Sequence, residues 1–127
     1  MQNMMTIVMV SNMDRSVAFY QLTLGLKLRF QSPEWSEFDL GQTTLALHDG
    51  GKPSPPSQGR EQIAGTASIG FTVDNLDDTF AQLKAKGVRF VMPPTVRENE
   101  GIRLAVAIDP DGLGISFAQV MTHAQPR

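Results

Sequence analysis

The chain has 127 residues, 41% of them hydrophobic and 19% charged, which is typical of one globular domain with a single core. It has no cysteine, which excludes disulfides, zinc–thiolate sites and thiol nucleophiles. We expect a cytoplasmic protein whose partner is a small molecule, not nucleic acid or a membrane, because the net charge is −2, no apolar run is long enough to cross a bilayer and no signal-peptide pattern is present.

Two similar segments organise the chain. The segment VSNMDRSVAFYQLTLGLKLRF in the first half resembles VDNLDDTFAQLKAKGVRFVM in the second half. Asn12 and Asn75 each precede an acidic residue and an apolar stripe at helical spacing, so each is predicted to cap the start of a helix. Gly25 and Gly87 are predicted to end these helices in the left-handed conformation. We interpret the pattern as an internal duplication.

Short strand-like runs accompany both helices. After its helix the first half continues with LKLRF, WSEFDL and TTLALH, and the second half continues with VRFVM, RLAVAI and GISFAQ. With a strand before each helix, both halves are predicted to be βαβββ modules, over residues 4–48 and 66–120. Residues 49–65, rich in Pro, Gly and Ser, are predicted to form a connector, with a lid over a cleft as the functional alternative. Residues 121–127 form a tail.

Several motifs resemble those of the vicinal oxygen chelate superfamily, which includes glyoxalase I, bleomycin-resistance proteins and extradiol dioxygenases. The superfamily signature S-x-x-F-Y-x-x-x-L-G is matched by SVAFYQLTLG at residues 16–25, and its later D-P-x-G signature by DPDG at residues 109–112. The resemblance implies a single α+β domain whose two modules form a curved mixed sheet around a cleft, with the helices on the outer face. It also implies a homodimer. Asp109 and Asp111 are interpreted as turn formers, with metal binding as the alternative.

The resemblance also indicates where a metal would be bound. Metal-dependent members carry four His or Glu ligands, one on each of four strands. The corresponding residues here are Met5, Ala46, Ser68 and Ser116. A thioether, a methyl group and two hydroxyls are poor ligands for zinc, nickel or iron. We therefore expect no metal and no other cofactor.

Strand alternation predicts which side chains face the cleft. If Ser68 faces it, Gly70 and Thr72 also face it, because alternate residues of a strand share a face. The same rule assigns the following residues to the cleft: Met5, Ile7, Met9, Thr44, Ala46, His48, Gly114, Ser116 and Ala118. The resulting surface is apolar with few hydroxyls, and its flexible methionines suit an irregular or flat ligand or, alternatively, simple core packing.

Four further candidates are ring-bearing or charged. His48 is the titratable residue on the predicted cleft side and the candidate acid–base catalyst, with a structural or solvent-facing role as the alternative. Trp35 and Phe38 are candidates for stacking on an aromatic ligand, with sheet-edge or dimer contacts and core packing as the alternatives. Arg103 is a candidate for pairing with an anionic ligand, with a solvated position as the alternative.

These expectations combine into one leading function, a metal-free member of the superfamily whose cleft binds a partly apolar or aromatic molecule. Sequestration in the manner of bleomycin-resistance proteins is the function that the resemblance favours. One alternative is a lyase or isomerase of the glyoxalase type, or a dioxygenase, with displaced metal ligands or acid–base catalysis by His48. Another is a dimer with a vestigial cleft. The ligand, and the pairing of the modules within one chain or across a dimer, stay open.

Overall fold

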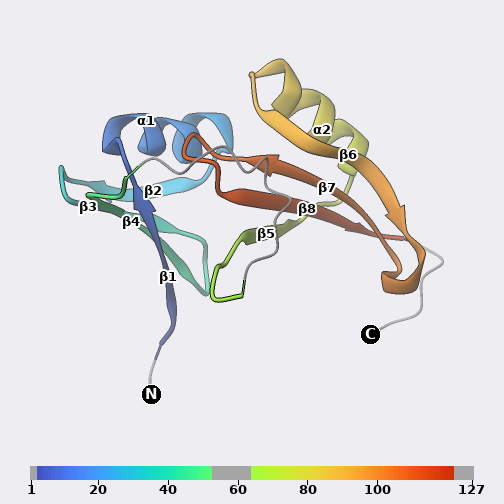
Figure 1. Ribbon diagram of the computed structural model, residues 1–127, viewed down its shortest axis with the longest axis horizontal. Coiled ribbons are helices and arrows are strands. Elements are labelled where there is room, and N and C mark those ends of the chain that lie inside the picture. Colours follow the sequence, from blue (N-terminus) through green and yellow to red (C-terminus); the bar gives the residue numbers. More distant parts are fainter. Residues whose placement is uncertain (1–2, 53–63, 122–127) are drawn as a thin grey trace. The chain divides into compact units, whose positions relative to one another are not determined.

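The computed structural model describes residues 3–52 and 64–121 as two compact units, Met1–Ser54 and Pro55–Arg127 (Figure 1). Each unit is a four-stranded mixed sheet with one main helical segment. Most of the predicted connector, for which a lid is the functional alternative, lies outside the described residues. Among the described residues, no helix is long and apolar enough to span a membrane.

The first unit contains one βαβββ module. Its elements are β1 (Met5–Val10), α1 (Met13–Ala18), the π-helical turn η1 (Phe19–Thr23), β2 (Lys27–Gln31), β3 (Trp35–Asp39) and β4 (Thr44–Asp49). The strand order is β1-β4-β3-β2, with β1 parallel to β4 and the other pairs antiparallel. The strand β1 is therefore an edge strand of this sheet and is hydrogen-bonded to β4.

The second unit repeats this arrangement. Its elements are β5 (Ile69–Thr72), α2 (Leu76–Ala85), β6 (Arg89–Arg97), the 3-10 turn η2 (Glu98–Glu100), β7 (Ile102–Ile108) and β8 (Gly114–Val120). The order β5-β8-β7-β6 is equivalent to that of the first unit, with β5 parallel to β8. The predicted α+β fold of two βαβββ modules is confirmed.

The local signals at the helix ends act as predicted. The Asn12 side chain accepts a hydrogen bond from the Arg15 amide at 3.0 Å, and the Asn75 side chain accepts one from the Asp78 amide at 3.1 Å. These bonds satisfy amides that have no partner within the first helical turn. Gly25 and Gly87 follow the helical segments with φ angles of 78° and 88°, a conformation that favours glycine.

The strand β6 is longer than the sequence predicts. It continues from the expected VRFVM through Pro93 and Pro94 as far as Arg97. Proline has no amide hydrogen for a ladder, and it is tolerated here because β6 lies at the edge of its sheet and its register with β7 shifts between Met92 and Thr95.

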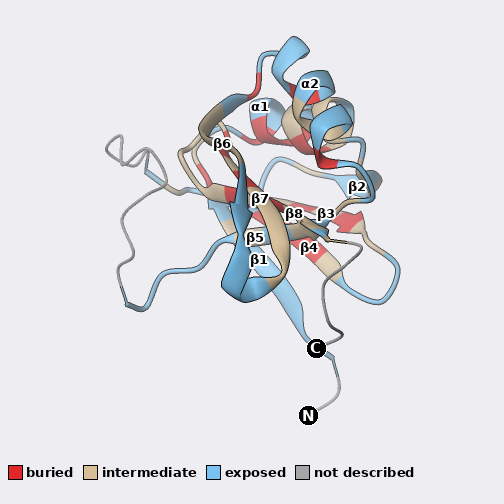
Figure 2. Ribbon diagram, turned by 90° about the vertical axis from the view of Figure 1, so that its right-hand side faces the viewer, coloured by how far each residue is buried: buried red, intermediate tan, exposed pale blue. Residues whose placement is uncertain are grey.

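In each unit the helix packs on one face of the sheet, and alternation separates that face from the opposite one. The first unit buries the apolar stripe of its helix, Met13, Val17 and Tyr20, and the second buries Leu76 and Leu83 of α2 (Figure 2). Aromatic rings contribute to the second core, where the ring centroids of Phe80 and Phe90 are 4.6 Å apart. We call the opposite side of each sheet its helix-free face, meaning that none of the described helices of the same unit covers it.

Candidate functional site

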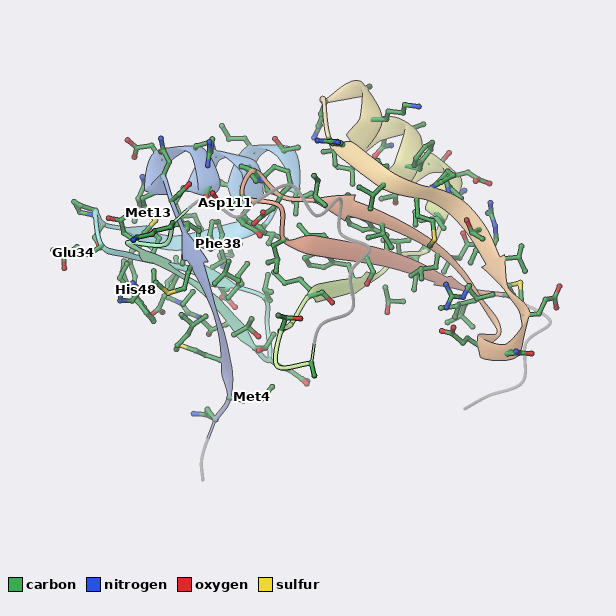
Figure 3. All side chains as sticks on the ribbon, in the orientation of Figure 1. Met4, Met13, Glu34, Phe38, His48 and Asp111 are labelled. Carbon is green, nitrogen blue, oxygen red and sulfur yellow. The ribbon has the colours of Figure 1, made fainter. Side chains whose placement is uncertain are left out.

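The helix-free face of the first sheet collects most of the predicted ligand-binding residues. Strand pairing across β1, β4 and β3 arranges its side chains in three rows, Met9–His48–Trp35, Ile7–Ala46–Glu37 and Met5–Thr44–Asp39. Figure 3 shows His48 on this side of the sheet and Phe38 on the side of α1. The structure therefore brings the predicted residues of β1 and β4 together with Trp35. That this face lines a cleft stays a prediction.

Apolar side chains on β1 are open to solvent. The exposed fractions of Met5, Ile7 and Met9 are 42%, 52% and 52%. Ala46, on the neighbouring strand, is fully buried. Adjacent exposed apolar residues on one face of an edge strand are typical of a surface that contacts a ligand or partner.

Two rings meet at the end of this face. The rings of Trp35 and His48 contact edge to face, with centroids 5.7 Å apart and planes at 88°. Trp35 is half-buried, whereas His48 is exposed. The Nδ1 atom of His48 lies 2.6 Å from the backbone oxygen of Asp49. Together with Met9, the two rings form a row of polarizable side chains. The Nε2 atom of His48 forms no hydrogen bond with the described residues.

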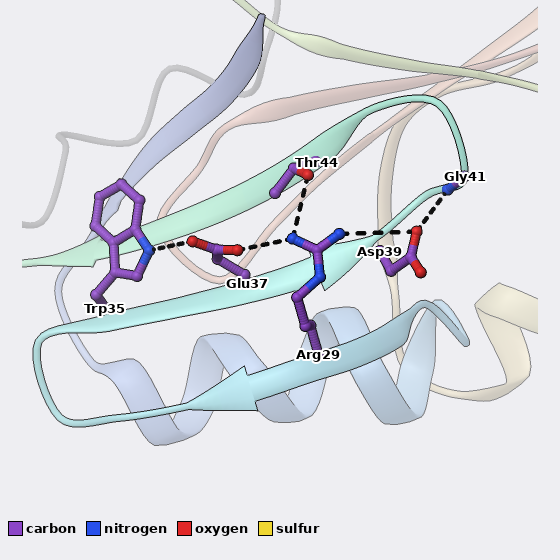
Figure 4. Close-up of polar contacts among 6 residues, drawn as sticks. All are labelled: Arg29, Trp35, Glu37, Asp39, Gly41 and Thr44. Atoms are coloured by element: carbon purple, nitrogen blue, oxygen red, sulfur yellow. Dashed lines mark hydrogen bonds and ion pairs between the residues drawn. The ribbon is translucent and has the colours of Figure 1, made fainter. Parts of the chain in front are cut away.

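A polar network holds Trp35 in place (Figure 4). The Trp35 indole N–H donates to Oε2 of Glu37 at 2.8 Å, and Arg29 donates to Oε1 of the same carboxylate at 2.7 Å. Arg29 also donates to the Thr44 hydroxyl at 3.3 Å and lies 3.9 Å from Asp39. The hydrogen bond from Trp35, and then the one from Arg29, lowers the pKa of Glu37. The ionised carboxylate therefore connects the indole to the guanidinium of the neighbouring strand.

Arg29 and Glu37 are two residues of this network that were not predicted from the sequence. The alternation in WSEFD gave a signal, because it places Trp35, Glu37 and Asp39 on one face and Ser36 and Phe38 on the other. The pairing of Arg29 with Glu37, however, depends on the β2–β3 register, which is interrupted by a shift between Leu28 and Phe30. Sequence alternation alone does not predict such an irregularity.

The remaining predicted residues with small side chains share the helix-free face of the second sheet. Gly70 is paired with Ser116, and a Cβ atom on Gly70 would lie 3.0 Å from the Ser116 hydroxyl. Thr72 is paired with Ala118. A Cβ atom on Gly114 would lie 3.7 Å from Cβ of Ser68, which places Ser68 over β8 on the same face. The strands β5 and β8 therefore present hydroxyls and small side chains on this face, next to the larger apolar residues Leu104 and Val106 of β7.

Two predicted ligand-binding residues lie on the helix-bearing faces instead. Phe38 is fully buried, with its ring centroid 6.0 Å from that of Tyr20. Arg103 forms two hydrogen bonds with Asp77 of α2, at 2.9 and 3.1 Å, and this pairing lowers the pKa of Asp77. These positions favour core packing for Phe38 and an ion pair between sheet and helix for Arg103 over the predicted ligand contacts.

Asp109 shapes the turn before β8, as predicted. Its Oδ1 atom accepts hydrogen bonds from the amides of Asp111 and Leu113 at 2.9 and 2.8 Å. Gly112 adopts a φ of 91°, and its amide donates to the Asp109 carbonyl at 3.0 Å. The buried Asp109 carboxylate thus shapes the turn and sets the start of β8.

The positions assigned to metal ligands do not fit a metal. Met5 and Ala46 lie on the helix-free face of the first sheet, and Ser68 and Ser116 on that of the second. Their thioether, methyl and hydroxyl groups lack the imidazole and carboxylate donors that borderline and hard dications prefer. Within residues 3–52 and 64–121, no group of three or more His, Cys, Asp or Glu residues is arranged to hold a metal ion.

Comparisons with known proteins agree with this architecture. The model of the family described as "Glyoxalase/Bleomycin resistance protein/Dioxygenase superfamily" matches residues 3–117. The protein "Uncharacterized protein YraH" of Bacillus subtilis (strain 168) is 28% identical over 110 residues, which cover 81% of this chain and 86% of that protein.

Two solved structures illustrate the likeness in fold. A glyoxalase/bleomycin resistance protein/dioxygenase from Alicyclobacillus acidocaldarius has a TM-score of 0.71 at 20% identity, and the match covers 94% of this chain and 91% of that chain. A lactoylglutathione lyase from Agrobacterium tumefaciens has a TM-score of 0.68 at 19% identity, with 91% of each chain covered. At these identities the likeness concerns the fold alone.

Proposed function

Because the chain belongs to the Glyoxalase/Bleomycin resistance protein/Dioxygenase superfamily, we propose that it binds a small, partly apolar or aromatic molecule on the helix-free face of its first sheet. The row Met9–His48–Trp35 is the observation that carries this proposal. A flexible thioether and two contacting rings offer a flat ligand dispersion contacts and apolar surface to bury. The exposed side chains of Met5 and Ile7 extend that surface along β1.

The proposed activity is sequestration without a chemical step or a metal. Sequestration needs affinity and a preorganised surface, and both are supported by the contacts of Trp35. Its indole is fixed by Glu37, so little side-chain freedom is lost when a ligand is bound. The residues at the metal-ligand positions, Met5, Ala46, Ser68 and Ser116, support a metal-independent mode of binding.

Catalysis by His48 is the second candidate. The observation in its favour is that His48 is exposed and its ring is oriented by the Asp49 carbonyl, as an acid–base catalyst requires. A lyase or isomerase of the glyoxalase type would act on a glutathione adduct or a related small molecule. A homodimer in the cytoplasm, suggested by the resemblance and the composition, is part of the proposal for either function.

A thermal-shift screen tests sequestration. Aromatic metabolites, glycopeptide drugs and glutathione adducts are suitable compounds, since a ligand of the native state raises the melting temperature. We expect Met9→Ser and Trp35→Leu to abolish the shift caused by a compound that binds. Leu22→Ser is the matched control, because Leu22 is also an exposed apolar residue of the first unit but lies on η1. An equal loss of the shift in Leu22→Ser would contradict the assignment of the site.

Two measurements separate the alternatives. Metal analysis of protein purified without an affinity tag or a chelator would contradict metal-free binding if it found a stoichiometric transition metal that is needed for the thermal shift. Turnover of a glutathione adduct that is lost in His48→Gln would favour the catalytic function. Light scattering of the intact protein measures whether it is a homodimer.

A further inference from the structure

We infer that His48 selects ligands that carry an N–H or O–H donor, because its ring presents a hydrogen-bond acceptor beside the Trp35 indole. The inference rests on the proposed function and narrows the ligand to flat, partly apolar molecules with a donor group at the edge. Three observations carry it: the tautomer of His48, the hydrogen bond that already occupies the Trp35 N–H, and the position of both rings in one row.

The tautomer follows from a single contact. The Nδ1 atom of His48 lies 2.6 Å from the backbone oxygen of Asp49, within hydrogen-bond distance. A carbonyl oxygen accepts hydrogen bonds and does not donate them, so Nδ1 carries the proton. A neutral imidazole has one N–H group, and Nε2 is therefore the nitrogen with the free lone pair.

Nε2 is left without a partner within the described parts of the chain. His48 is exposed, and its Nδ1 contact with Asp49 is the hydrogen bond that it forms with residues 3–52 and 64–121. The nearest donor in the row is the Trp35 indole N–H, which is already bound by Glu37 at 2.8 Å. The third member, Met9, has no donor. The row thus offers an acceptor that must be matched by water or by the ligand.

A ligand lying on this row would meet apolar surface and one acceptor. A molecule with an N–H or O–H at its edge replaces the water on Nε2 with a hydrogen bond of its own. A molecule with only ether or carbonyl oxygens at that edge would face the lone pair with its own lone pairs and lose the bond without compensation. This difference discriminates between molecules of nearly the same shape.

The tautomer can be tested without a ligand. Nitrogen-15 spectra of the labelled protein distinguish a protonated from an unprotonated ring nitrogen. The chain has two histidines, so His123→Ala assigns the signals of His48. We expect a protonated Nδ1 and an unprotonated Nε2 in the neutral ring. The opposite tautomer would overturn the inference while leaving the proposed binding function intact.

Selectivity is tested with indole and 1-methylindole, which differ in one N–H donor. We expect indole to bind roughly fivefold more tightly, as one additional hydrogen bond predicts, and to shift the Nε2 signal of His48. His48→Phe keeps a flat ring without the acceptor, so it should bind both compounds with the same affinity. Equal binding of the two compounds to the natural protein would overturn the selectivity alone. Binding of neither compound would overturn both the selectivity and the proposed aromatic ligand.

Discussion

The indole nitrogen of Trp35 donates a hydrogen bond of 2.8 Å to the carboxylate of Glu37, two residues along the same strand. The two side chains share a face of β3, and Arg29 of β2 holds the other carboxylate oxygen at 2.7 Å. The orientation of the one tryptophan in the chain is therefore coupled to an ion pair between strands. The fluorescence of Trp35 can therefore report on the candidate site.

Acid should release this contact at a pH lower than the usual carboxyl range. The hydrogen bonds from Trp35 and Arg29 lower the pKa of Glu37 below its usual value of 4.5. The stabilisation is therefore present above the unfolded pKa and is lost as the pH falls through the lowered folded pKa. We expect the fluorescence of Trp35 to change with a midpoint below 4.5, while far-ultraviolet circular dichroism shows that the fold persists.

Two variants identify the group responsible for this change. Glu37→Gln should remove it, because the amide does not titrate. Glu34→Gln, a change in the turn before β3, should leave the midpoint where it is. A midpoint above 4.5 in the natural protein would contradict the lowered pKa.

The two aromatic residues of β3, Trp35 and Phe38, should respond differently to truncation. Phe38 is fully buried on the α1 side, so Phe38→Ala should lower the free energy of unfolding by about 3 to 4 kcal/mol through lost burial and cavity formation. Trp35 is half-buried on the helix-free face, and Trp35→Ala should cost about half as much while abolishing ligand binding. Urea denaturation followed by circular dichroism measures both costs. Equal costs would argue against the assigned faces.

A pair of glycines tests the register between β5 and β8. Gly70→Ala would place Cβ 3.0 Å from the Ser116 hydroxyl, and we expect this crowding to lower the free energy of unfolding by about 1 kcal/mol. Gly114→Ala is the matched control, because its Cβ would lie at an ordinary 3.7 Å from Cβ of Ser68. That variant should be neutral or more stable by about 0.5 kcal/mol, since alanine restricts the unfolded chain.

A second substitution separates crowding from other effects in Gly70→Ala. Ser116→Ala removes the hydroxyl and should restore most of the stability lost in Gly70→Ala. Gly70→Ala, Ser116→Ala, the variant with both substitutions and the natural protein form a double-mutant cycle, measured by urea denaturation. Independent, additive effects would contradict the Gly70–Ser116 pairing.

The turn before β8 should depend on one oxygen atom. Asp109→Ala removes the acceptor for the amides of Asp111 and Leu113, and we expect it to lower the free energy of unfolding by about 2 kcal/mol. Asp109→Asn keeps an oxygen at the same place and should cost about 1 kcal/mol or less. Thermal denaturation monitored by circular dichroism is a suitable measurement. Similar losses in both variants would show that the charge, and not the acceptor geometry, stabilises the turn.

The sequence by itself determined the module pattern, because the signals that set it are local. An asparagine cap at Asn12 or Asn75 satisfies an amide three residues away, and a glycine at Gly25 or Gly87 supplies the conformation that ends the helical segment. Strand alternation likewise placed Ile7, Ala46 and their neighbours on one side of the first sheet. Such features depend on residues a few positions apart.

Only the tertiary structure decided which side chains meet across strands and between sheet and helix. Trp35 and Phe38 both stood as candidates for ligand stacking; alternation separates them, and only packing showed that the face of Phe38 is the buried one. Arg29 of β2 pairs with Glu37 of β3, and Arg103 of β7 pairs with Asp77 of α2. Both are contacts between separate elements. The physical reason is that side chains alternate with a period of two, so the register, which is set by distant partners, decides the face that each one occupies.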